Sequence, residues 1–387
     1  MTQMKIAIFG DNGIGRFFAQ LFDDVPDVTF YLSERNRSGL NVTQRAQHRL
    51  SNNTQLRHVL QSPIKAFLRY RHNNYDNKLD FHYFELEEAV RQNLFDVAIT
   101  AAERSLYTLS GLRRQYANFK LIYWTPFTIP FVDMFAARSF YIRQHSFPHV
   151  DRFIAITDTC AATHKFEGIP ENKISQVYPG IDLAMFRPRA KEASRASGVN
   201  PDKFNILFVG KLASWKGCHT LIYAAKLLAA EIPNIHVTFV GRGAQRDNLI
   251  KAAHLLGIAE RITFDDLVAY ENIPLFYNAA DIFVLPSLPA INLAEQFGYV
   301  VAEAMASGIP AVVSRVGGLP EVVGHDARLL FTPGDYRELA NRILALHQNK
   351  NLYNEAARTC LERAVENFDA RKNGQKLLAI SKSVFSE

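Results

Sequence analysis

Residues Glu295–Gly308 read EQFGYVVAEAMASG, and this stretch decides the fold. It lies between two short apolar runs, DIFVL at Asp281–Leu285 and AVVS at Ala311–Ser314. Its interior, Val300–Ala306, has the composition of a buried helix, and Gly308 follows as a residue suited to end that helix. A strand, a helix and a second strand in this order form the repeating unit of a parallel sheet.

The same alternation extends through the C-terminal half of the chain. Short apolar runs alternate there with stretches that have the spacing of amphipathic helices. The expected strands are Asn205–Val209, His236–Val240 and Arg261–Phe264, and the expected helices are Thr220–Leu228 and Ala244–Leu256. This order predicts a mostly parallel sheet with helices on both faces.

The N-terminal half shows the alternation a second time. Its expected strands are Lys5–Phe9, Val28–Leu32, Asp96–Thr100, Lys120–Tyr123 and Phe153–Thr157, with helices at Arg16–Phe22 and Glu85–Leu94. We therefore predict an α/β chain of two Rossmann-like, doubly wound domains that face a central cleft. Such sheets bind ligands outside the carboxyl ends of their strands.

The chain has 387 residues, more than one ordinary core accommodates. Residues 184–202 are rich in Pro, Ala, Ser, Lys and Arg and are predicted to be a linker. We predict an N-terminal domain over residues 1–183 and a C-terminal domain over residues 203–365. The last segment, 366–387, is expected to be a helix that packs back on the N-terminal domain.

The composition is that of a globular protein, with 48% hydrophobic and 21% charged residues. No run approaches the ~18 consecutive apolar residues of a membrane-spanning helix. The apolar run Ile6–Phe9 is too short for the core of a signal peptide. Cys160, Cys218 and Cys360 stand far apart and in no metal-binding spacing. We therefore expect a cytoplasmic protein with free, buried thiols.

The positive charge is concentrated in residues 35–78. This segment holds nine Lys or Arg residues and one Asp, a net charge of +8, so the rest of the +6 chain carries −2. One interpretation is a face that binds an anionic membrane surface, which would place the protein on the inner face of the membrane. Direct binding of an anionic acceptor and a merely solvated face are the alternatives. Nucleic acid is not expected, because no nucleic-acid-binding fold accompanies the charge.

Two carboxylates flank the expected helix start near Gly298. Glu295 precedes it, and Glu303 lies inside the helix. The free N–H groups of a helix start attract anions, whereas carboxylates repel phosphate and accept hydrogen bonds from sugar and ribose hydroxyls. The alternative is that Glu303 is a surface residue, but its apolar neighbours leave almost no polar face.

Two lysines and three glycines follow the neighbouring strands. Lys211 and Lys216 stand beyond the strand that ends at Val209, where their charges can meet a diphosphate. Gly210, Gly241 and Gly243 follow two strands and permit close backbone approach to a ligand. Solvated lysines and ordinary turns are the alternatives for these positions.

Several motifs in order give the C-terminal half its resemblance to a family. Besides the Glu-x7-Glu element they are FVGKL at Phe208–Leu212, WKG at Trp215–Gly217, VGRG at Val240–Gly243, VGGLPEVV at Val316–Val323, YPGID at Tyr178–Asp182, and the run Tyr277–Ser287. From about residue 150 to residue 370 the chain resembles the family 4 retaining glycosyltransferases, which have the GT-B fold.

The resemblance implies an acceptor-binding N-terminal domain and a C-terminal domain that binds a nucleotide sugar. Lys211 and Lys216 would bind the diphosphate and, with Glu295, support catalysis. Glu303 would bind the ribose. Leu267 and Val268 would lie near the base, and Glu295 with the backbone of Phe297 and Gly298 would hold the sugar. The other donor-binding residues implied are Gly210, Gly241, Gly243, Tyr299 and Val300. Lys211 departs from the arginine common at its position in the family, which removes a bidentate contact but keeps the charge.

The N-terminal glycines Gly13 and Gly15 follow the first expected strand. The family resemblance implies a glycine-rich loop there, near the donor phosphate. A dinucleotide-binding fingerprint is the rival interpretation, with Glu34 as the ribose acid. The spacing in this chain is GxxGxG rather than GxGxxG, which disfavours a dehydrogenase.

Many relatives carry a histidine after the strand that corresponds to Lys120–Tyr123, whereas this chain has Trp124-Thr125-Pro126-Phe127. We therefore assign no general base. The expected function is retaining transfer of a hexose-type sugar from a nucleotide diphosphate donor, UDP-sugar first and GDP-mannose next, to a hydroxyl of a glycan or lipid-linked acceptor. No cofactor and no metal are expected, since the chain has no Asp-x-Asp. A nucleotide-sugar-binding protein without turnover, or another GT-B enzyme such as an epimerase, is the alternative.

Overall fold

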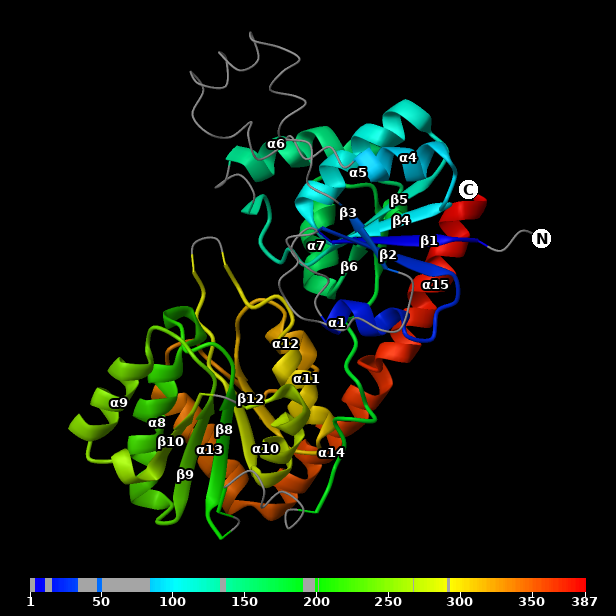
Figure 1. The fold of residues 1–387 in the computed structure, drawn as a ribbon. Helices are drawn as coiled ribbons and strands as arrows, with labels where there is room; N and C mark the ends of the chain where they lie inside the picture. The colour runs from blue at the N-terminus through cyan, green and yellow to red at the C-terminus, as the bar shows by residue number, and fades with distance from the viewer. Residues whose placement is uncertain are drawn as a thin grey trace. The chain divides into compact units, whose positions relative to one another are not determined.

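The computed structural model describes residues 4–10, 16–33, 47–50, 84–132, 137–190, 199–200, 202–266, 268–290 and 293–387. The chain forms two compact units, drawn in Figure 1. The N-terminal unit comprises Met1–Gly180 together with Arg371–Glu387, and the C-terminal unit comprises Ile181–Ala370.

The N-terminal unit is built on a seven-stranded parallel sheet in the order β3-β2-β1-β4-β5-β6-β7. Its strands are β1 (Ile6–Gly10), β2 (Val28–Ser33), β3 (Gln47–Leu50), β4 (Val97–Thr100), β5 (Lys120–Thr125), β6 (Arg152–Ala155) and β7 (Ile174–Gln176). Every residue of β1 and β4 is buried, which fits the continuous apolar runs of strands covered on both faces.

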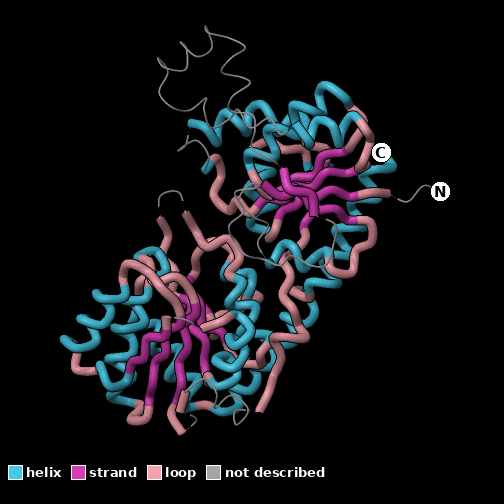
Figure 2. The backbone as a smooth tube through the Cα atoms, in the orientation of Figure 1, coloured by secondary structure: helices cyan, strands magenta, loops and turns pink. Residues whose placement is uncertain are grey.

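Helices cover both sides of this sheet, as Figure 2 shows. They are α1 (Arg16–Ala19), α4 (Phe84–Arg91), α5 (Glu103–Tyr116), α6 (Ala137–Ser146) and α7 (Asp158–Phe166), with 3-10 turns η1 (Gln20–Phe22), η4 (Phe147–His149) and η5 (Glu171–Lys173). The side chain of Thr157 caps α7 by accepting a hydrogen bond from the backbone N–H of Cys160.

The C-terminal unit repeats the design with a six-stranded parallel sheet, in the order β10-β9-β8-β11-β12-β13. Its strands are β8 (Phe204–Val209), β9 (Ile235–Val240), β10 (Ile262–Asp265), β11 (Ile282–Leu285), β12 (Ala311–Ser314) and β13 (Leu330–Phe331). Successive strands are added on one side of β8 as far as β10, and on its other side from β11 onward. The boundary between β8 and β11 is a topological switch point, which is where doubly wound sheets bind ligands.

The connecting helices of the C-terminal unit also lie on both sides of its sheet. They are α8 (Cys218–Glu231), α9 (Arg246–Leu255), α10 (Ile273–Ala279), α11 (Tyr299–Ala306), α12 (Leu319–Val322), α13 (Tyr336–Gln348) and α14 (Lys350–Asn367), with turns η7 (Ser214–Lys216), η8 (Ala259–Arg261) and η9 (Tyr270–Asn272). The prediction of two doubly wound α/β domains is confirmed.

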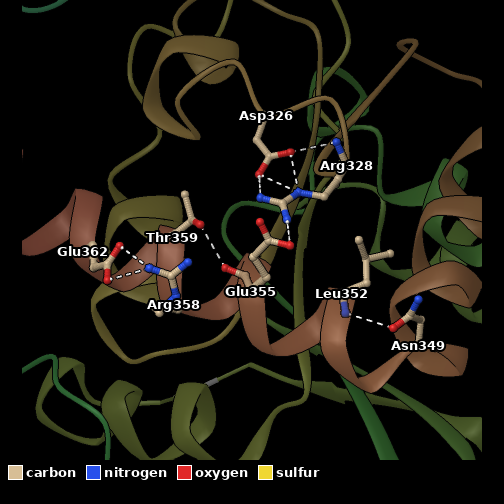
Figure 3. Close-up of polar contacts among 8 residues, drawn as sticks. All are labelled: Asp326, Arg328, Asn349, Leu352, Glu355, Arg358, Thr359 and Glu362. Carbon is tan, nitrogen blue, oxygen red and sulfur yellow. Dashed lines mark hydrogen bonds and ion pairs between the residues drawn. The ribbon is translucent and has the colours of Figure 1, made fainter.

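Polar contacts attach α14 to the segment that enters β13. Asn349 caps the helix by accepting a hydrogen bond from the N–H of Leu352 at 3.0 Å. Arg328 bridges Asp326 and Glu355, with nitrogen–oxygen distances of 2.6 Å and 3.0 Å, as Figure 3 shows. The bridge connects the loop before β13 to the first turns of α14.

The helix α15 (Ala370–Ser386) belongs to the N-terminal unit almost from its first residue. The helix lies close to η1 at Gly374, where an added Cβ would lie 1.7 Å from the carbonyl oxygen of Leu21. The sequence predicted that this helix starts at residue 366. The boundary between the two units lies at residues 370 and 371, four residues later. Only a glycine allows the helix backbone to lie this close to η1.

The first boundary also lies earlier than the sequence indicated. The C-terminal unit begins at Ile181, and Phe186, placed by the prediction in the linker, is 1% exposed. Its ring packs edge-on against Tyr270 and Tyr277 at 5.7 and 5.9 Å between centroids. Arg189 N donates to Asn278 Oδ1 at 2.6 Å. Residues 186–189 therefore belong to the C-terminal unit and not to a linker, with Phe186 in its core.

The three cysteines are free and buried, as expected. Burial raises the pKa of both the Cys218 and the Cys360 thiol to about 12, which keeps them protonated near neutral pH. Within the described ranges, no helix has both the length and the apolar composition needed to cross a membrane.

Replacing Gly374 by Ala tests the contact between α15 and η1. The added methyl group would collide with the Leu21 carbonyl, so we expect overpacking to cost about 1–3 kcal/mol. The matched control is Gly111→Ala in α5, where an added Cβ meets nothing within 4 Å. That change should stabilise the fold through helix propensity. Thermal melts of both variants check this, and a Gly374→Ala variant as stable as the wild type would contradict the packing.

Candidate functional site

The candidate site lies at the carboxyl edge of the C-terminal sheet, where β8, β11 and β12 end. Two backbone hydrogen bonds join the three loops that follow these strands. Leu288 N donates to the carbonyl of Trp215 at 2.7 Å, and Gly318 N donates to the carbonyl of Glu295 at 2.9 Å. The loops therefore hold one another at the switch point of the sheet.

Two glycines make this interlock possible. Gly217 (φ +64°) and Gly317 (φ +55°) both have left-handed backbones. A Cβ at Gly217 would lie 1.9 Å from the Pro286 carbonyl oxygen, and one at Gly317 would lie 2.0 Å from the Glu295 carbonyl oxygen. Both positions need glycine for conformation and for space. The loop that carries Glu295 is thus fixed by backbone contacts, independently of its side chain.

Lys216 and Glu295 form an ion pair in this interlock. Both side chains are 12% exposed. Nζ of Lys216 bonds to Oε2 of Glu295, and Ser287 Oγ donates to the same oxygen at 3.0 Å. The ring of Trp215 lies below the ammonium group, with 4.4 Å from Nζ to the ring centroid. The sequence prediction that Lys216 and Glu295 belong to one site is therefore consistent with their direct contact.

The two carboxylate oxygens of Glu295 differ in their hydrogen-bond partners. Oε2 has two donors, whereas Oε1 has no hydrogen-bond donor among the described residues. A carboxylate oxygen without a partner accepts hydrogen bonds from hydroxyl groups. The ammonium of Lys216 is a source of positive charge for an anion that enters the same site.

The helix α11 begins beside this ion pair. Its N-cap is Gly298, with φ +83°, and a Cβ there would lie 2.7 Å from Leu319 Cδ2. Phe297 is 1% exposed and packs against Phe368, 5.2 Å between ring centroids, which anchors the loop in the core. Tyr299 and Val300 form the first turn, where backbone N–H groups lack intrahelical acceptors. Gly308 ends the helix with φ +84°, as predicted.

Glu303 is buried inside α11, with 1% of its surface exposed. The surface-residue alternative for this position is therefore wrong. Tyr270 OH donates to Oε1 and Tyr277 OH donates to Oε2, both at 2.8 Å. Burial, and then the charge of Glu303, raise the pKa of Tyr277 well above its ordinary value. Two tyrosine hydroxyls thus compensate the buried carboxylate.

The predicted glycine positions pack against each other. A Cβ at Gly241 would lie 2.0 Å from the Gly210 carbonyl oxygen, and one at Gly243 would lie 2.1 Å from the Leu212 carbonyl oxygen. The close approach that these glycines permit is between the loops after β8 and β9, not only toward a ligand. Lys211, in the same loop, is exposed and takes no part in the ion pair of Lys216.

Three predicted positions lie outside the described residues, namely Gly13, Gly15 and Leu267. The basic segment 35–78 also lies outside them, apart from the backbone of β3. Val268 is described and partly exposed. Their roles remain predictions.

The end of β5 carries a buried polar side chain, that of Thr125. Thr125 is fully buried, and its Oγ1 lies 3.1 Å from Nε2 of His164, which is also fully buried. Nδ1 of His164 contacts Glu167, which pairs with Arg143 at 2.8 Å. Burial opposes the charge of Glu167, but hydrogen bonds from His164, Arg143 and the Phe131 N–H lower its pKa. His164 therefore has a contact on each ring nitrogen and no exposed surface.

Solved structures share this architecture along nearly the whole chain. HepE of Anabaena in complex with UDP superposes with a TM-score of 0.79 at 20% identity, covering 98% of this chain and 100% of that one. Sucrose-phosphate synthase of Thermosynechococcus elongatus gives a TM-score of 0.75 at 19% identity, covering 99% of this chain and 100% of that one. At this identity the likeness shows the fold alone, and the fold is GT-B.

Residues 190–362 match the family model described as Glycosyl transferases group 1. D-inositol 3-phosphate glycosyltransferase 2 of Catenulispora acidiphila is 38% identical over 208 residues, 48% of this chain and 46% of that protein. The D-inositol 3-phosphate glycosyltransferase of Mycolicibacterium gilvum is 40% identical over 157 residues, 39% and 34% respectively. The chain thus spans about a third to a half of the length of these relatives.

Four residues of the site were not singled out from the sequence. Ser287 and Trp215 contact the Lys216–Glu295 pair, and Tyr270 and Tyr277 hold Glu303. Trp215, Tyr277 and Ser287 stand in motifs quoted from the sequence, but those motifs assigned them no partner. The signal for the tyrosines was that Glu303 stands among apolar residues and so needs donors from elsewhere. Which tyrosines supply them depends on how α10 and η9 pack against α11, and residue spacing does not encode that packing.

Changing Tyr277 to Phe tests the compensation of Glu303. The change leaves a buried carboxylate short of one donor, so we expect a loss of about 1.5–3 kcal/mol in the free energy of unfolding. The matched control is Tyr353→Phe, because Tyr353 OH donates at 2.9 Å to a neutral acceptor, the Asp281 carbonyl. That change should cost about 0.5–1.5 kcal/mol. Urea unfolding compares the two, and equal losses would contradict the account.

Proposed function

We propose that this protein is a retaining glycosyltransferase that uses a nucleotide diphosphate sugar. It transfers a hexose-type sugar to a hydroxyl group of a glycan or lipid-linked acceptor. A UDP-sugar is the favoured donor and GDP-mannose the next. The match of residues 190–362 to the model of the glycosyl transferases group 1 supports this class of reaction.

The observation that carries the proposal is the Lys216–Glu295 pair at the switch point of the C-terminal sheet. A nucleotide sugar brings two chemically different parts to such a site. Its diphosphate needs positive charge, which Lys216 and the helix start at Gly298 provide. Its sugar needs hydrogen-bond acceptors, and Oε1 of Glu295 provides one.

The proposed chemistry follows from this division. The bond between the sugar C1 and the diphosphate oxygen breaks, and the acceptor oxygen forms a bond to C1 on the same face. Lys216 stabilises the negative charge that grows on the departing phosphate. The phosphate oxygen takes the proton of the acceptor hydroxyl, so no side chain acts as general base.

The names of the relatives support the class of reaction, and the titles of the solved structures support the donor class. Several relatives are D-inositol 3-phosphate glycosyltransferases, and HepE has been solved with UDP and with UDP-glucose. We extend this to a UDP-sugar as the first donor to test. The acceptor of this chain is proposed only as a hydroxyl-bearing glycan or lipid-linked sugar.

Substituting Lys216 by Ala tests the donor site. We expect UDP-glucose or GDP-mannose to raise the melting temperature of the wild type, because a ligand that binds the native state stabilises it. The Lys216→Ala variant should lose this shift, since one charged contact to the diphosphate is removed. The control is Lys226→Ala, an exposed position on α8. Equal shifts in both variants would contradict the assignment of Lys216.

The same preparation separates transfer from mere binding. Release of UDP or GDP with transfer of the sugar to an acceptor supports the glycosyltransferase. Binding without turnover across acceptors would favour a nucleotide-sugar-binding protein, and isomerised donor without transfer would favour an epimerase.

A chelation experiment tests the proposed independence from metal. Because lysine and helix N–H groups would stabilise the leaving group, we expect EDTA to leave the rate of UDP release from UDP-glucose unchanged. Loss of activity with EDTA, restored by magnesium or manganese, would contradict this part of the proposal.

A further inference from the structure

We propose that Ser287 is a positioning residue for Glu295, which keeps this carboxylate aimed at the sugar when Lys216 turns to the diphosphate. The inference rests on the proposed function and deepens it. Ser287 follows β11, is fully buried, and donates from Oγ to Oε2 of Glu295 at 3.0 Å.

The backbone of Ser287 is itself held from two sides. Ser314, fully buried at the end of β12, donates from Oγ to the Ser287 carbonyl at 2.6 Å. The next residue, Leu288, donates its N–H to the Trp215 carbonyl at 2.7 Å. Ser287 therefore lies at the start of the loop that carries Glu295, where backbone contacts join this loop to the loop of Lys216 and to the end of β12. Its position does not depend on the side chain of Lys216 or of Glu295.

A second donor on Glu295 becomes necessary once a diphosphate is present. Lys216 has one ammonium group, which contacts Glu295 in the structure. A diphosphate carries more negative charge than a carboxylate and draws this ammonium group away. Glu295, with a side chain that is 12% exposed, would then lose its cationic partner. The hydroxyl of Ser287 remains on Oε2 and prevents the carboxylate from rotating.

The consequence is a division of labour between the two carboxylate oxygens. Ser287 occupies Oε2, so Oε1 is left to accept from a sugar hydroxyl. Without Ser287 the carboxylate could follow Lys216 toward the phosphate or turn away. The loss should therefore affect ligands that contain the sugar, and it should not affect the nucleoside diphosphate alone.

The test measures affinities of the Ser287→Ala variant of the full chain by calorimetry, with UDP and UDP-glucose, and with GDP and GDP-mannose. We expect Kd for the nucleoside diphosphate to stay within about twofold, and Kd for the matching nucleotide sugar to rise about tenfold, as expected when a charge-assisted hydrogen bond is lost. The matched control is Ser381→Ala in α15, a fully buried serine whose Oγ donates to the Leu377 carbonyl at 2.8 Å. It should change neither Kd.

Two further variants keep the test decisive. Ser287→Cys retains the size and a weak donor, so its effect should lie between wild type and Ser287→Ala, even if the alanine variant folds poorly. In a Glu295→Ala background, Ser287→Ala should have no further effect on sugar binding. Equal weakening of diphosphate and nucleotide sugar by Ser287→Ala, or a full effect in the Glu295→Ala background, overturns the inference. A wild-type chain that binds none of the four ligands overturns the proposed function and this inference together.

Discussion

The ion pair between Lys216 and Glu295 is the interaction on which the candidate site depends. Placing two charges at 12% exposure is costly, and it is favourable only when geometry and additional hydrogen bonds compensate it. Ser287 and the ring of Trp215 provide that compensation. The loops after β8, β11 and β12 hold these four side chains in place through their backbone contacts. These contacts are so close that they leave no room for a Cβ at Gly217 or Gly317.

The pair also prepares the site for its proposed ligand. A lysine that already has a partner is held in one conformation, so less side-chain entropy is lost when an anion replaces that partner. Removal of Lys216 leaves Glu295 buried without its cation, so a mutation there affects both halves of the site. The buried carboxylate of Glu303, which accepts hydrogen bonds from two tyrosines, follows Glu295 in the sequence by more than one helix turn and is a second negative group.

Much of the fold could be predicted from the sequence because its information is local. Continuous apolar runs such as Ile282–Leu285 identify strands buried on both faces, and the helical spacing between them requires crossovers. The domain boundaries were harder to predict from the sequence. Phe186 stands in a Pro- and Arg-rich stretch that resembles a linker, yet it packs between Tyr270 and Tyr277. Only the packing of residues nearly a hundred positions apart decides its place.

The candidate site, too, could be predicted only in part from the sequence. The positions of Lys216 and Glu295 beyond strand ends follow from the sequence, since carboxyl ends of parallel strands meet at one edge. Their direct contact, and the donation from Ser287, depend on the side-chain geometry of two loops and could not be predicted from residue spacing. For Gly241 and Gly243, the sequence indicated the need for close approach but not that the approach is to a neighbouring loop.

A crystal structure of the chain with UDP-glucose, or with GDP-mannose if that ligand binds more tightly, tests the central claim most directly. The account predicts that Nζ of Lys216 has left Glu295 for a diphosphate oxygen. It also predicts that Oε1 of Glu295 accepts a hydrogen bond from a sugar hydroxyl while Oε2 still contacts Ser287. A bound nucleotide sugar with Lys216 still paired to Glu295, and with the sugar distant from that carboxylate, would contradict it.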